Sequence, residues 1–161
     1  MMNEQAIRLD RMRFTKNTTS SRLAILAIVF DVLYFVSIYK TNMSFYYSIL
    51  MGASILYNLV FMLAAFLSSE GVKNYKQGYS YLLCALGIIQ IARIFILPVR
   101  AHATVETVEG VEMLAMSNGQ FVRVIVYLVA SAVCLVAAAV VNFTKSRALA
   151  AHIAGLDGQK A

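Results

Sequence analysis

Charged side chains are scarce in this sequence of 161 residues. Asp, Glu, Lys and Arg make up 14% of the chain, and the mean hydropathy is +0.71. A soluble domain carries about 25% charged residues, because water must solvate most of its surface. Proline occurs only once, at Pro98, and the apolar content of 60% excludes a disordered chain. The composition therefore predicts a protein whose outer surface faces lipid.

Cysteine and histidine are also rare, with two of each in the chain. Cys84 and Cys134 lie within apolar segments, and no Cys-x-x-Cys pattern or cluster of His with Cys or carboxylates occurs. The usual sequence patterns of metal and redox sites are therefore missing, and we predict no metal and no cofactor. His102 and His152 fall on opposite sides of the bilayer in the topology derived below. Because no acid, base and nucleophile converge, we expect the chain not to be an enzyme.

Long apolar runs dominate what remains. A bilayer core about 30 Å thick needs roughly 20 apolar residues of helix to cross it. Lipid offers no hydrogen-bond partner to an open backbone, so such segments must be helical. We therefore predict an all-α, polytopic membrane protein, in which residues 1–161 form a single membrane domain. Its four-helix bundle is expected to comprise residues 23–39, 45–67, 79–97 and 121–143.

The distribution of Lys and Arg predicts the orientation of these helices. Ten of the 14 Lys and Arg residues lie on one side, mainly in the basic segment 1–22 and the tail 144–161, whereas only Lys40 and Arg100 lie on the other. Basic loops stay in the cytoplasm, so both termini are expected there. The positive residues flank apolar helices, which favours anionic lipid headgroups over nucleic acid as their partner. We expect a prokaryotic inner or plasma membrane.

Two segments outside the predicted helices have a distinct character. The external loop 98–120 contains Glu106, Glu109 and Glu112 at intervals of three residues, which would form an acidic stripe on a helix. Such a stripe is a candidate docking element, although an ordinary solvated loop explains the residues almost as well. Within the tail, residues 144–156 are expected to continue the fourth helix into the cytoplasm.

Five polar residues interrupt the predicted helices: Asp31, Asn58, Gln90, Arg93 and Arg123. A charged group at mid-bilayer costs about 2.5–3.5 kcal/mol, so each one needs a partner or a function. At a rise of about 1.5 Å per residue, Asp31 lies roughly 12 Å below the outer end of its helix, within reach of the Arg93 side chain. These residues are expected to form a polar cluster, either a structural pair that orients helices or a binding site. Arg123 is close enough to the outer surface to extend into it.

Small residues recur in the fourth predicted helix. Ala130, Cys134 and Ala138 follow a small-xxx-small pattern, which allows two helices to approach closely. The pattern predicts either a face for a partner helix or tight packing within the bundle.

Together these features favour a non-catalytic integral membrane protein. The leading interpretation is a small accessory or structural subunit of a larger, transport-type membrane complex, whose partners are other membrane subunits or further copies of this chain. The alternative is a small homo-oligomeric transporter or channel that uses Asp31 as an intramembrane carboxylate.

Overall fold

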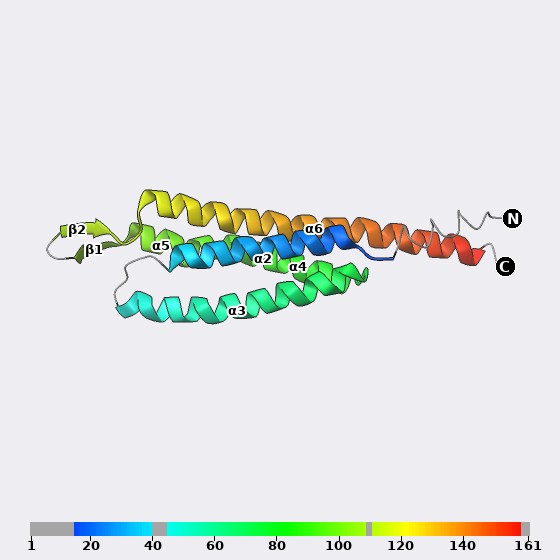
Figure 1. Cartoon of the computed structure of the whole chain (residues 1–161), viewed down its shortest axis with the longest axis horizontal. Helices are drawn as coiled ribbons and strands as arrows, with labels where there is room; N and C mark the ends of the chain where they lie inside the picture. The colour runs from blue at the N-terminus through cyan, green and yellow to red at the C-terminus, as the bar shows by residue number, and fades with distance from the viewer. Residues whose placement is uncertain (1–14, 40–44, 109–110, 159–161) are drawn as a thin grey trace.

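Four long helices lie along the length of the molecule, and each runs in the opposite direction to the long helix before it (Figure 1). The computed structural model describes residues 15–39, 45–108 and 111–158. The elements, in chain order, are α2 (Thr18–Ile38), α3 (Phe45–Lys73), α4 (Gly78–Ile96), the short α5 (Pro98–Ala103), β1 (Val105–Val108), β2 (Val111–Leu114) and α6 (Asn118–Gly158).

The prediction of four helices that are long and apolar enough to cross a membrane is confirmed for α2, α3, α4 and α6. Two of their ends differ from the predicted ones by five residues or more. Helix α2 begins five residues earlier, because the side chain of Asn17 caps it by accepting a hydrogen bond from the Ser20 backbone N–H. Helix α3 continues six residues further, to Lys73. Helix α6 is 41 residues long and includes the continuation expected beyond residue 143.

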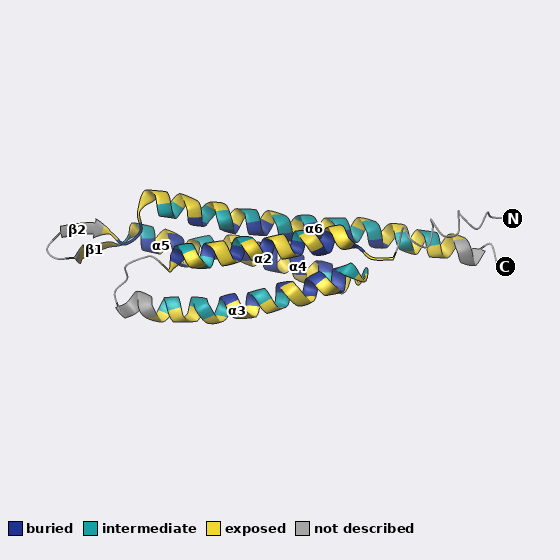
Figure 2. Cartoon of the chain, in the orientation of Figure 1, coloured by how far each residue is buried: buried dark blue, intermediate teal, exposed yellow. Residues whose placement is uncertain are grey.

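The helices pack unequally. Helix α2 packs on α6 and α3, and α4 packs mainly on α6. Only 17% of the most apolar stretch of α3 is buried, against 33% in α2 and 39% in the other two spans. The exposed residues of α3 form most of its outward surface (Figure 2). Helix α3 is therefore the least enclosed member of the bundle.

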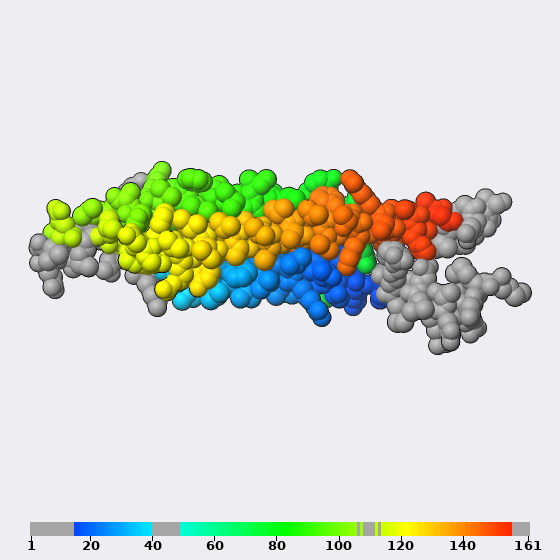
Figure 3. Space-filling model, turned by 90° about the horizontal axis from the view of Figure 1, so that it is seen from above, coloured from blue at the N-terminus to red at the C-terminus, as the bar shows by residue number. Residues whose placement is uncertain are grey.

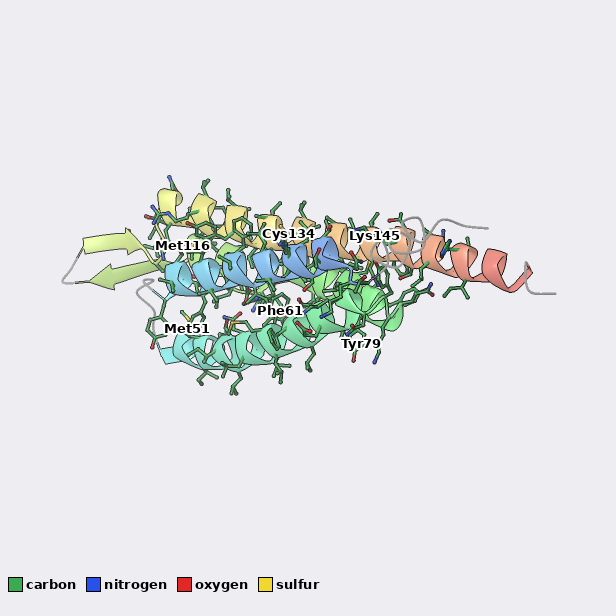
Figure 4. The ribbon with its side chains drawn as sticks, turned by 45° about the vertical axis from the view of Figure 1, so that its right-hand side comes forward. Met51, Phe61, Tyr79, Met116, Cys134 and Lys145 are labelled. Carbon is green, nitrogen blue, oxygen red and sulfur yellow. The ribbon has the colours of Figure 1, made fainter. Side chains whose placement is uncertain are left out.

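The core consists of two apolar clusters arranged along the bundle axis. One contains Phe61, which lies between α3 and α2 (Figure 4), together with Ala27 of α2. The other, nearer the β-hairpin, contains Met116 and Tyr34 of α2. Asp31 lies between Ala27 and Tyr34 on the same helix, so a polar layer separates the two apolar clusters.

Helix α6 is the longest of the helices described, and it packs against both α2 and α4. At about 1.5 Å per residue its 41 residues extend for about 60 Å, roughly twice the thickness of a bilayer core. Figure 3 shows α6 lying along the bundle with α2 on one side and α4 on the other, and then projecting beyond both.

The segment between α4 and α6 contains a β-hairpin that the sequence analysis did not predict. Strands β1 and β2 pair antiparallel, with Val105 opposite Leu114 and Val108 opposite Val111. Glu106 and Glu112 lie in these strands, so the helical acidic stripe proposed for them is wrong, and Glu109 falls outside the described residues. The reason is local: valine and threonine favour extended backbone and outweigh the weak helical period.

Candidate functional site

A buried ion pair joins α2 to α4 at mid-bundle. Arg93 Nη1 lies 2.8 Å from Asp31 Oδ1, and the two side chains are 7% and 0% exposed. Gln90, one turn before Arg93 on α4, donates from Nε2 to the same Asp31 oxygen at 2.9 Å and accepts from Arg93 Nη1 at 2.8 Å. The spacing of three residues places Gln90 and Arg93 on one face of the helix.

The other two long helices complete this polar cluster. Arg93 Nη2 donates to Asn58 Oδ1 of α3. Gln90 Nε2 also donates to Ser131 Oγ of α6 at 3.1 Å, and Ser131 in turn donates to the backbone oxygen of Ala27 at 2.9 Å. All four membrane-crossing helices are therefore connected through side chains at one level of the bundle.

Two tyrosine rings contact the guanidinium group of Arg93. Its Cζ atom lies 4.6 Å from the ring centroid of Tyr34 and 4.5 Å from that of Tyr57. An aromatic face attracts a cation, and the attraction grows when water is excluded. Both rings come from residues close to the cluster in sequence: Tyr34 lies one turn after Asp31 on α2, and Tyr57 directly precedes Asn58 on α3.

Three buried polar atoms of this cluster have no hydrogen-bond partner among the described residues: Asp31 Oδ2, Asn58 Nδ2 and Tyr57 Oη. Buried polar groups are nearly always paired, because leaving one unpaired costs about 1–3 kcal/mol. The cluster therefore keeps some hydrogen-bonding capacity beyond its own internal contacts.

Some residues predicted for sites lie elsewhere. Arg123 is exposed near the start of α6 and does not join the cluster, in keeping with a side chain that extends toward the outer surface. Ala138 is fully buried inside the bundle, where its backbone oxygen accepts a hydrogen bond from Ser20 of α2. The three-residue face proposed for a partner helix is thus incomplete, because Ala138 closes the bundle internally; Ala130 and Cys134 are half-buried.

A second polar network, at the end of the bundle opposite the β-hairpin, was not predicted. Asn142 of α6 accepts from Asn17 Nδ2 at 3.0 Å and donates to Ser80 Oγ of α4 at 2.7 Å. Nearby, the hydroxyl groups of Ser21 and Ser69 are 2.8 Å apart and connect α2 to α3. Serine and asparagine at predicted helix ends are common enough that their spacing alone did not reveal this network.

A cavity of about 210 Å³ lies beside the Asp31–Arg93 cluster, between α3 and α4. Most of its wall is apolar, and Tyr34, Ser54, Tyr57 and Arg93 provide the polar side chains. Among the described residues, no group of three or more His, Cys, Asp and Glu is placed to hold a metal ion.

The chain was compared with protein-family models, with curated proteins and with solved structures, and no significant match was found in any of the three. The geometry of the cluster and the cavity must therefore carry any functional argument.

Proposed function

We propose that this chain is a non-catalytic accessory or structural subunit of a larger, transport-type membrane complex. In this proposal it resides in a prokaryotic inner or plasma membrane with both termini in the cytoplasm. Its basic N-terminal segment contacts anionic lipid there.

The observation that supports the proposal is the enclosure of the intramembrane charges. Asp31 and Arg93 neutralise each other within one chain, and the Asp31 side chain is fully buried. A carboxylate that carries an ion must be reached from water at some stage, whereas a carboxylate that orients helices can stay enclosed. The pair also connects α2 and α4 directly and reaches α3 through Asn58. This arrangement favours a rigid scaffold.

Both ends of the bundle offer surfaces for contact with other proteins. The β-hairpin projects at one end, and the last turns of α6 project at the other (Figure 1). Ile153, on the projecting part of α6, is 50% exposed. These elements exceed what four membrane crossings require.

The proposal is tested by extracting the tagged full-length chain from its own membrane with a mild detergent and determining the mass and composition of the complex. We expect foreign membrane subunits in fixed stoichiometry. A complex that contains only copies of this chain would contradict the proposal.

One observation supports the alternative of a small homo-oligomeric transporter or channel. Asp31 Oδ2 has no partner among the described residues, so this buried oxygen keeps the capacity to bind a proton or an ion. The alternative requires a homo-oligomer, and it requires Asp31→Asn to abolish ion flux in proteoliposomes while the protein stays folded. Unchanged flux, or no flux in the wild type, would exclude it.

If foreign subunits are found, the acidic hairpin can be tested as their docking element. Changing Glu106, Glu109 and Glu112 to Gln should preserve expression but weaken co-purification several-fold at low salt and less at high salt, because salt screens exposed charges. Glu70→Gln, at the far end of the bundle, serves as the control. Equal retention of the subunits by both variants would place the interface elsewhere.

A further inference from the structure

The cavity between α3 and α4 opens sideways, onto the surface that the helices present to lipid. Ile89 and Ile96 of α4 line it and are 42% and 53% exposed. On the opposite wall, Ala53 of α3 is exposed. The opening arises because α3 packs on α2 and less extensively on α4. A molecule dissolved in the bilayer can therefore enter this cavity without passing through water.

One wall of the cavity carries hydrogen-bond donors in an apolar surrounding. Only 6% of the surface of Arg93 is exposed, and Arg93 lines the cavity together with Tyr57. A guanidinium group has five N–H donors, of which Asp31, Gln90 and Asn58 accept from three. The Tyr57 hydroxyl has no partner among the described residues. Donor capacity is therefore present on a wall that is mostly hydrocarbon.

The size of the cavity limits what can occupy it. Apolar cavities of about 150 Å³ accommodate a molecule of the size of benzene. The volume of about 210 Å³ is of the same order, so an aromatic ring or a segment of alkyl chain fits.

The charge balance limits the head group of the occupant. Because Asp31 and Arg93 already neutralise each other, an added ion would remain uncompensated in a low-dielectric site. A neutral oxygen that accepts a hydrogen bond carries no such cost. The donors on the wall and the neutral pair behind them thus favour a hydroxyl or carbonyl group.

We propose that the cavity between α3 and α4 binds the apolar part of a neutral lipophile whose hydroxyl or carbonyl oxygen lies against Arg93 and Tyr57. The site is independent of the proposed subunit role, because a bound lipophile requires neither a partner chain nor ion flux. Its source is either a long-chain membrane lipid or a small molecule that partitions into the bilayer.

The test uses the full-length chain in nanodiscs and three photoactivatable probes: a long-chain alcohol, a short-chain alcohol and a long-chain sulfonate, each with a diazirine near the head group. We expect alcohol adducts to concentrate on the cavity walls around Ala53, Tyr57 and Ala92, and the sulfonate to give at most a tenth as many there. Labelling by the long alcohol alone identifies a lipid as the source, and labelling by both alcohols identifies a small molecule.

Two variants fill the cavity from opposite walls. Ala53→Phe on α3 and Ala92→Phe on α4 should each lower alcohol labelling of the facing wall at least tenfold. The matched control is Leu56→Phe, because Leu56 is on α3, 67% exposed and outside the cavity lining; its labelling should stay within twofold of wild type. Labelling spread evenly over all lipid-facing helices, or equal labelling of filled and control variants, would overturn the proposal.

Discussion

At the scale of single residues, the most informative feature is the buried ion pair between Asp31 and Arg93, because burying a charge in a low-dielectric environment costs free energy. Moving a carboxylate and a guanidinium out of water costs several kcal/mol for each ion, and their attraction offsets this only when the remaining donors and acceptors are also occupied. Gln90 bonds to both members, and Asn58 accepts from the far side of Arg93. The amide groups therefore offset part of the cost of burying the pair, and the pair fixes the rotation of α2 and α4 about their axes.

The pairing predicts a coupled response to mutation. Asp31→Asn and Arg93→Leu should each destabilise the folded protein by about 3–5 kcal/mol, because each leaves a buried partner unpaired. The double variant should lose less than the sum of the two, since neither charge then remains. The free energy of unfolding is measured in mixed micelles for the wild type, the two single variants and the double variant. Strict additivity would contradict a direct energetic contact between the two side chains.

At the scale of elements, the tight connection between α3 and α4 determines how these helices approach. Tyr75 adopts a φ of 59° in this turn, and its backbone oxygen accepts from Ser146 of α6 at 3.1 Å. A Cβ atom at Gly71 would overlap the ring of Tyr79, which packs directly on the glycine. Figure 4 shows Tyr79 at this end of the bundle. Only a residue without a side chain at position 71 therefore lets the Tyr79 ring pack in this place.

Two glycines of α3 should consequently respond in opposite ways to alanine. Gly71→Ala should destabilise the protein by about 1–3 kcal/mol, because the Tyr79 ring must move out of its place. Gly52→Ala should be neutral or stabilise by up to about 1 kcal/mol, because nothing lies within 4 Å of the new atom and alanine favours the helix. Thermal unfolding in detergent distinguishes them. A similar loss at both positions would mean that helix propensity, and not contact with Tyr79, controls the result.

At the scale of the whole molecule, an even number of long helices brings the start of α2 and the end of α6 to the same end of the bundle (Figure 1). The β-hairpin lies at the other end. The excess of Lys and Arg near the chain termini predicts that the end with the termini faces the cytoplasm.

This orientation is tested by cysteine labelling. With Cys84 and Cys134 replaced, single cysteines are placed at four test positions: Lys16, Lys73, Glu109 and Gln159. A membrane-impermeant thiol reagent on intact cells should modify only the Glu109 variant, and all four should react once the cells are opened. Modification of the Lys73 variant on intact cells would refute the predicted topology.

The site was predictable in part, and the limits are physical. Asp31, Asn58, Gln90 and Arg93 stand out because polar residues within apolar helices are costly, and depth along the helix axis placed them at similar levels. Helix rotation was not available from depth, so Arg123 was grouped with them although it is exposed. Ser131 escaped notice because a single hydroxyl in an apolar run costs little, and its role depends on α6 lying against both α2 and α4.

The amino-acid sequence alone predicted how many helices are long and apolar enough to cross a membrane and approximately where they lie, because length and hydropathy are local properties of a segment. It also identified the residues whose burial would need a partner. Only the tertiary structure decided which helices are neighbours, that Ala138 faces inward, and that α3 leaves a cavity beside Arg93. These features depend on the rotation and tilt of whole helices. Packing between segments distant in sequence sets both, and no local pattern encodes them.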